Sequence, residues 1–109
     1  MITNSNDSYI VETSVTGNIT GDAIDMSIYD VLAFQCVWTG TLAGSITVEA
    51  SLDGTTWVDV GISPAVSPAG SAGTAIIDLT DFAPNKARAK FTFSAGTGNL
   101  TIKEYRKGR

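Results

Sequence analysis

The residues that could do chemistry in this sequence begin with an acidic glycine loop, SLDGTTW, at positions 51–57. Such a loop could bind calcium, form a sugar-binding tip with Trp57, or make a tight turn. A calcium loop needs more oxygen ligands at alternating positions, and a sugar platform needs a second aromatic nearby; the sequence offers neither. Asp-Gly between two apolar segments is a strong hairpin signal. We therefore predict that Asp53 and Gly54 form a structural turn.

Nucleophilic and metal chemistry is limited by the absence of histidine. Without it, Ser-His and Cys-His nucleophiles and the usual zinc sites are excluded. Cys36 is the single cysteine, so no intrachain disulfide is possible, and its apolar neighbours favour a buried thiol. The acid pairs Asp78 with Asp81 and Glu49 with Asp59 would suit a glycosidase only if they faced one cleft. We predict no catalytic residue, no cofactor and no metal site, and hence no enzyme.

The basic residues are gathered at one end of the sequence. Ten of the eleven acids precede residue 86, whereas all seven Lys and Arg residues follow residue 85, and the net charge is −4. In one interpretation Arg88 and Lys90 lie on a solvated strand face and pair with acids on neighbouring strands. In the other, the late strand and the tail form a positive surface that meets an acidic partner. We keep both for Arg88 and Lys90, and we favour partner binding for Arg106, Lys107 and Arg109.

Nucleic acid is a poor candidate for that partner, because the whole chain is acidic and Tyr105 is the one aromatic near the basic run. No run of about 20 apolar residues is present, so we expect no membrane span. The first residues, MITNSNDSYIVET, have neither a basic region nor an apolar one. We therefore expect no ordinary signal peptide, and synthesis in the cytoplasm.

The elements that must position these residues are strands. Apolar and polar residues alternate with period two, and Gly, Pro, Asn and Asp clusters interrupt the alternation at short intervals. This pattern is typical of an all-β sandwich or barrel. Segment 31–38 is apolar on both faces, which predicts a central strand covered on both sides. In all, the pattern predicts strands at residues 9–13, 23–28, 31–38, 45–52, 57–62, 74–79, 87–93 and 100–105.

A length of 109 residues indicates one domain. We assign the β-sandwich domain to residues 9–105, between a flexible N-terminal segment at 1–8 and a basic C-terminal tail at 106–109. Both ends are polar. We expect the domain to dock on a partner by one face while one of these ends lies across an adjacent subunit.

Two longer runs carry a resemblance to a known group of proteins. They are AIDMSIYDVLAFQCVWTGTLAGSITVEASLDGTTWVDV and RAKFTFSAGTGNLTIKEYRKG, which together cover roughly residues 23–107. Their recognisable parts are the W-T-G-T turn at Trp38 to Thr41, the hairpin from Glu49 to Trp57 and the final hairpin from Gly96 to Thr101. With these turn and core motifs the chain resembles small virion proteins of tailed bacteriophages.

The resemblance implies a single antiparallel β-sandwich of about eight strands, of jelly-roll type. It also implies a head decoration or cement protein, commonly a trimer, that docks on the major capsid protein or other virion subunits and stabilises the assembled head. Such a protein is made in the host cytoplasm and resides in the virion. A neck or tail position fits the residues equally well. The alternative is a carbohydrate-binding or adsorption module of the same fold, which exposure of Trp38, Trp57 or Tyr105 on one flat face would favour.

Overall fold

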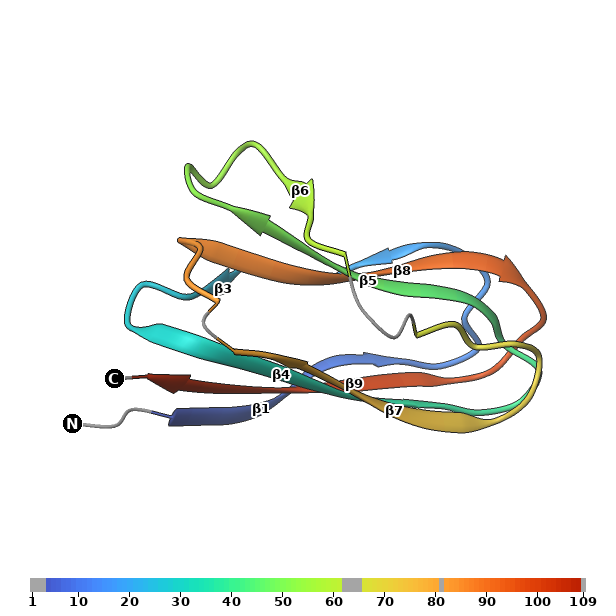
Figure 1. Ribbon diagram of the computed structural model, residues 1–109. Coiled ribbons are helices and arrows are strands. Elements are labelled where there is room, and N and C mark those ends of the chain that lie inside the picture. Colours follow the sequence, from blue (N-terminus) through green and yellow to red (C-terminus); the bar gives the residue numbers. More distant parts are fainter. Residues whose placement is uncertain (1–3, 62–65, 81, 109) are drawn as a thin grey trace.

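The computed structural model describes residues 4–61, 66–80 and 82–108 of the chain. The regular structure of this part consists of nine strands (Figure 1). The described residues contain no helix that could cross a membrane. In chain order the strands are β1 (Asn4–Glu12), β2 (Ile19–Thr20), β3 (Ile24–Asp25), β4 (Tyr29–Trp38), β5 (Ala43–Ser51), β6 (Val58–Asp59), β7 (Gly73–Leu79), β8 (Lys86–Ala95) and β9 (Leu100–Gly108).

The strands form two antiparallel sheets stacked face to face (Figure 1). Sheet A has the order β1-β9-β4-β7, and sheet B has the order β2-β8-β5-β6 with β3 also paired to β8. The chain crosses from one sheet to the other after β1, β3, β4, β6, β7 and β8, which is the path of a jelly roll. The predicted all-β antiparallel sandwich is therefore confirmed. Counting β2 and β3 as one interrupted strand gives the expected number of about eight.

The core lies between the sheets and follows from the alternation of side chains along each strand. On β4 every second residue from Leu32 to Trp38 is buried, and on β9 Leu100 and Ile102 are buried. A fully buried Leu, Ile or Phe side chain contributes about 1.5–3 kcal/mol, so this layer holds the two sheets together. The facing positions of sheet B are occupied by Ile46, Val48, Ala87, Ala89 and Phe91.

The second face of β4 differs from the prediction that both faces would be covered. The strand is central in sheet A, between β9 and β7. Its second face is the outer face of the sheet, where Val31, Ala33 and Val37 are half-buried and Gln35 is exposed. The prediction is wrong on this point, because a sandwich of two sheets leaves each sheet one outer face. Neighbouring strands alone shelter these aliphatic side chains.

Strand pairing extends closer to both ends of the chain than the sequence indicated. β1 begins at Asn4, which pairs with Lys107 of β9, and Gly108 of β9 pairs with Tyr29 of β4. Residues 4–8 and 106–108 therefore belong to the paired strands of sheet A, where the sequence suggested a flexible segment and a tail. Residues 1–3 and 109 lie outside the described residues. The local pattern misses this pairing because the partner strand is at the opposite end of the sequence.

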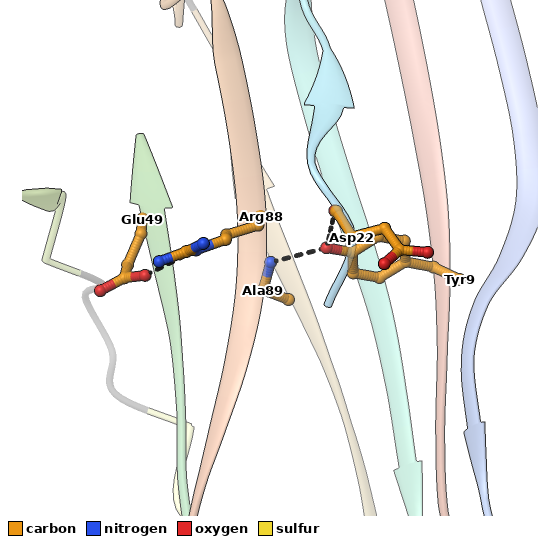
Figure 2. Close-up of polar contacts among 5 residues, drawn as sticks. All are labelled: Tyr9, Asp22, Glu49, Arg88 and Ala89. Carbon is orange, nitrogen blue, oxygen red and sulfur yellow. Dashed lines mark hydrogen bonds and ion pairs between the residues drawn. The ribbon is translucent and has the colours of Figure 1, made fainter. Parts of the chain in front are cut away.

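Tyr9 links the edge of sheet A to sheet B (Figure 2). It lies at a β-bulge of β1, and its hydroxyl donates to the Asp22 carbonyl at 2.5 Å and accepts from the Ala89 amide at 3.2 Å. These backbone groups lie where pairing with β8 is interrupted between β2 and β3. A methyl group at Gly21 would overlap the Tyr9 ring, so glycine makes room for the contact. Burial raises the pKa of Tyr9 to about 12.

Candidate interaction surfaces

The SLDGTTW stretch forms the loop between β5 and β6. Asp53 Oδ1 accepts from the backbone amides of Thr56 at 2.8 Å and Thr55 at 2.9 Å. It also accepts from the Ser51 hydroxyl at 3.0 Å. These hydrogen bonds, led by those from the two amides, hold the pKa of Asp53 well below its usual range. Gly54 has a φ of +81°, a conformation that favours glycine. The described residues contain no cluster of acids and cysteine that could hold a metal ion.

A shallow groove lies beside this loop. Its described lining is mostly aliphatic, with Ala50, Leu52, Val58 and Pro84 next to Asp53. Leu52 and Val58 are exposed, and Figure 1 shows the loop standing away from the rest of sheet B. The carboxylate of Asp53 is engaged by the turn itself. The groove therefore offers an apolar contact surface rather than a pair of acids facing a substrate.

Arg88 and Lys90 lie on the outer face of sheet B. Arg88 Nε forms an ion pair with Glu49 Oε1 of β5 at 2.8 Å, which Figure 2 draws. The Arg88 guanidinium also lies 4.0 Å from the centre of the Trp57 ring. Lys90 lies between threonines of β2 and β5 in the sheet register. Arg88 thus forms its ion pair and its ring contact within its own chain. This agrees with the first of the two interpretations from the sequence, in which it lies on a solvated strand face and pairs with an acid of a neighbouring strand.

Arg106 lies on the inner side of β9, after the buried residues Ile102 and Glu104. Its Nε lies 3.1 Å from Glu104 Oε2, and its Nη1 donates to the Asp25 carbonyl of β3 at 3.0 Å. Its guanidinium also lies 4.9 Å from the centre of the Tyr29 ring. Glu104 is 4% exposed. This cluster therefore joins the two sheets at the end of the sandwich where β9 ends.

The basic residues expected to form one partner-binding surface are distributed over three places. Arg88 and Lys90 lie on the outer face of sheet B, Arg106 lies between the sheets, and Lys107 lies on the outer face of sheet A. Arg109 lies outside the described residues. The alternation of side chains explains the division, because consecutive residues of a strand point to opposite faces. The structure does not bring these residues together.

The outer face of sheet A, called here the sheet A face, gathers residues that the sequence pattern did not single out. Lys103, Tyr105 and Lys107 lie on β9, and Ile76 and Asp78 lie on β7. Ile76 is 71% exposed and Tyr105 is 36% exposed. A shallow groove lies between them over β4. Among the described residues of the sheet A face, Asp78 is the acid, and Lys103 and Lys107 are the bases. The face therefore combines exposed apolar groups with more ammonium groups than carboxylates.

Two sequence signals could have located the sheet A face. On β9 the buried residues Leu100 and Ile102 fix the inner side, so the odd-numbered residues from 101 to 107 must point outward. On β7 two large aliphatic residues are consecutive, and only one of them can point into the core. Ile77 is buried and Ile76 is exposed. The sequence does not say which of the two takes the outer position, because that depends on the register with β4.

No protein-family model matches the chain, and no curated protein sequence matches it significantly. Among solved structures, the SPBc2 prophage-derived protein YomS is similar with a TM-score of 0.65 and 11% identity, over 99% of this chain and 96% of YomS. The PBSX exported protein XepA is similar with a TM-score of 0.70 and 8% identity, over 94% of this chain and 36% of XepA. This chain thus spans about a third of XepA.

A structure of Bacillus endospore appendages, described as disulfide-linked pili, is similar with a TM-score of 0.57 and 16% identity, over 98% of this chain and 88% of that one. Identities this low indicate a common fold and no more. The chain has the same β-sandwich architecture as a prophage-derived protein and as a chain from the Bacillus endospore appendage structure.

Proposed function

We propose that this chain is a structural protein of a tailed-phage virion, specifically a decoration or cement protein that docks on the assembled head. The observation that carries the proposal is the likeness to YomS, which extends over 99% of this chain and 96% of that prophage-derived protein. The virion-type turn and core motifs of the sequence support the same role. A likeness over the whole of both chains favours a comparable role for the whole domain.

The sheet A face is the surface best suited to docking. Lys103 and Lys107 flank Tyr105 on β9, and the exposed Ile76 lies in register with Lys103 across Gln35 of β4. An apolar centre with charged groups around it is the usual anatomy of a protein interface. The excess of ammonium groups selects a partner surface that is apolar and bordered by acids. The partner in this proposal is the major capsid protein or another virion subunit.

Docking of this kind stabilises a head by mass action. A protein that binds the assembled shell but not its free subunits contributes about 2.7 kcal/mol per site when its free concentration is a hundred times Kd. Contacts from β9 and β7 to different subunits would clamp neighbours together. Association of several copies would multiply the number of contacts. The resemblance to decoration proteins favours a trimer for this purpose, made in the host cytoplasm before it joins the virion.

The proposed role is non-enzymatic. Cys36, the single thiol, is fully buried, and this burial raises its pKa to about 12. Asp53 is engaged by the amides of its own loop. Among the described residues the grooves are shallow and mostly aliphatic or polar, and the Ser51 hydroxyl that contacts the Asp53 carboxylate also accepts from the Gly54 amide of the same turn. A rigid block that binds by one face fits these features.

The test is co-sedimentation of the purified chain with heads of the phage that encodes it, assembled without this protein. We expect stoichiometric binding that weakens at high salt. The double variant Lys103→Glu/Lys107→Glu should weaken binding by at least about tenfold, because it opposes like charges at the interface. The matched control Lys86→Glu/Lys90→Glu makes the same change in net charge on the outer face of sheet B. It should bind as the wild type does.

Each outcome bears on a different part of the proposal. Equal losses in the two double variants would contradict the sheet A face as the docking surface. Binding to isolated tails or necks, without binding to heads, would overturn the decoration role and assign the protein to another part of the virion. A chain that binds no part of the virion would overturn the whole proposal.

Glycan binding, the alternative from the sequence, would need aromatic side chains on one flat face. Trp38 is buried in the core and donates its indole N–H to the Ser71 carbonyl at 3.0 Å. Trp57 lies beside the Arg88 guanidinium on the side of sheet B, and Tyr105 lies on sheet A. These three rings do not form one platform, so no observation favours this role over docking. Glycan-array binding that is lost in Trp57→Ala would reverse that preference.

A further inference from the structure

The edges of the two sheets are protected unequally. In sheet B the edge strands β2, β3 and β6 have two residues each. Beyond the end of β6, the same edge of β5 is covered by isolated β-bridges from Val66 to Ile46 and from Ala69 to Ala43. In sheet A the edge strand β1 carries the bulge at Tyr9. Short strands, covering segments and bulges are the devices by which proteins prevent pairing between edges.

Among the described residues, none of these devices is found at the edge strand β7. Its seven residues, GTAIIDL from Gly73 to Leu79, contain no proline and no lysine. They pair with β4 in continuous register, without a bulge. Among the described residues, the hydrogen bonds of the β7 backbone go to β4 alone. Its outward side chain Ile76 is also among the most exposed large apolar groups of the chain. A regular apolar edge of this length is a template for another strand.

We propose that β7 pairs antiparallel with β7 of a second copy of this chain, so that two copies of sheet A join into one continuous sheet. The second copy is the chosen occupant because the strand is complementary to itself. When Ile76 lies opposite Ile76 of the second copy, the two exposed isoleucines cover each other. In the same register Thr74 lies opposite Asp78, and its hydroxyl can donate to that carboxylate.

The neighbouring registers are less favourable. Paired residues must lie on the same face of the joined sheet, so the centre of the pairing can move only by whole residues along β7. A centre at Ile77 would oppose Ile76 to Asp78, which leaves a carboxylate against an aliphatic group. A centre at Asp78 would oppose two carboxylates, which repel each other. Of the registers centred on Ile76, Ile77 and Asp78, the one centred on Ile76 is therefore favoured by side-chain chemistry.

The strength of this contact follows from its size. A single pair of seven-residue strands buries much less than the roughly 1,200 Å² of a stable interface, so a dimer in dilute solution should be weak. Copies concentrated on a common surface are held at high effective concentration, which compensates for weak pairing. The two-fold pairing closes at two copies, in contrast to the trimer that the resemblance implies. The inference does not depend on the proposed virion role.

The test measures the mass of the purified chain by sedimentation and light scattering at protein concentrations up to about 1 mM, where weak complexes are populated. We expect a monomer–dimer equilibrium. Ile76→Lys should weaken the dimer by more than about tenfold, because it opposes two ammonium groups at the centre of the pairing. The matched control is Val11→Lys, which changes a 64% exposed residue of the protected strand β1 in the same way. It should dimerise as the wild type does.

The register has its own test. Thr74→Lys should tighten the dimer by about fivefold because it opposes Asp78 of the second copy, and Thr74→Asp should weaken it by a similar factor. Ile76→Cys should form a symmetric disulfide-linked dimer under mild oxidation, whereas Val11→Cys should remain monomeric; Cys36 is fully buried and does not compete.

A strictly monomeric or trimeric wild type would overturn the inference. So would equal effects of the two lysine variants. Dimerisation is measured without heads, and head binding is tested with Lys103→Glu/Lys107→Glu instead of Ile76→Lys, because Ile76 also belongs to the sheet A face; the two proposals can therefore fail separately.

Discussion

The outer faces of the two sheets carry similar numbers of basic residues, but these residues have different cross-strand neighbours on the two faces. On sheet B, Arg88 is paired with Glu49, and Lys86 lies opposite Asp25 in the strand register. On sheet A, Lys103 lies opposite Gln35, and Lys107 lies opposite Val31. On sheet B, Arg88 and Lys86 thus have acidic neighbours and Lys90 lies between threonines, whereas neither lysine of sheet A has an acid opposite it on β4. Cross-strand neighbours, rather than the count of charges along the sequence, decide which charges of a face are balanced.

The largest expected difference in stability is between variants of the two ion pairs, one on β9 of sheet A and one on the outer face of sheet B. The Arg106–Glu104 pair has side chains 19% and 4% exposed, whereas the Arg88–Glu49 pair has side chains 25% and 15% exposed. Arg106→Leu removes a partner from a buried carboxylate and should cost about 3 kcal/mol or more of the free energy of unfolding. Arg88→Leu should cost at most about 1 kcal/mol. Urea unfolding of both variants measures this, and equal losses would mean that burial does not distinguish the pairs.

The next effect concerns the contact that connects the two sheets. Tyr9→Phe removes the hydroxyl that satisfies the Asp22 carbonyl and the Ala89 amide, and it should cost about 1–3 kcal/mol. Tyr29→Phe is the control, because it removes a hydroxyl from the same kind of side chain. Among the described contacts, no hydrogen bond from the Tyr29 hydroxyl joins the sheets, so this variant should lose less free energy of unfolding than Tyr9→Phe. Thermal unfolding compares the two, and a larger loss for Tyr29→Phe would contradict the role given to Tyr9.

The raised pKa of Tyr9 also leads us to expect a loss of stability at alkaline pH. Burial raises the pKa of Tyr9 from its usual value of 10.0 to about 12, so the folded state retains this proton more firmly than the unfolded state does. The stabilisation is complete below pH 10 and is lost as the pH rises toward 12. Buried Cys36, whose pKa is also raised to about 12, adds to the loss. Tyr9→Phe should flatten the profile in part, and an unchanged profile would exclude Tyr9 as a source.

A smaller effect is expected at the loop between β5 and β6. Gly54→Ala forces a φ of +81° on a residue with a side chain, and it should cost about 1 kcal/mol. Asp53→Ala should also destabilise the fold, because it removes the acceptor of two backbone amides. The lowered pKa of Asp53 makes its contribution present above its usual value of 3.8 and lost as the pH falls below it. The Asp53→Ala variant should therefore be less stable at neutral pH. Its stability should also fall less as the pH is lowered through the range where the Asp53 carboxyl takes up its proton.

The smallest expected effect returns to the two outer faces. Lys103→Glu/Lys107→Glu on sheet A should change stability by less than about 0.5 kcal/mol, as exposed substitutions usually do. Lys86→Glu/Lys90→Glu on sheet B should cost slightly more, because Lys86 then opposes Asp25 with a like charge. Calorimetry resolves the order of the two variants. The reverse order would indicate that the sheet B charges are not balanced by their neighbours.

The fold could be predicted because its signals are local. The period-two alternation marks the strands, and the Asp53-Gly54 pair marks the loop that ends β5. The bounds of β1 and β9 could not be predicted, because Asn4 and Lys107 define them by pairing across the length of the chain. Residues at such ends look polar and unstructured until their partner strand is known.

The candidate surface was harder to predict than the fold. Arg106 and Lys107 are adjacent in sequence and were expected on one surface, yet the pleat directs one inward and the other outward. The burial of Glu104 could have been anticipated from the alternation that starts at Leu100 and Ile102. The exposure of Ile76 could not, since it depends on which of two isoleucines the register with β4 turns toward the core.

The pairing of β1 with β9 has a consequence for synthesis of the protein. Within the sandwich, the strand that is made first has its hydrogen-bonding partner in the strand that is made last, and the Tyr9 hydroxyl has its partner amide at Ala89 of β8. Sheet A therefore cannot be completed until β9 has been made, and distant pairings of this kind form slowly. A chain truncated within β9 would leave β1 without its partner strand, so a loss at one end of the sandwich also removes the pairing at the other.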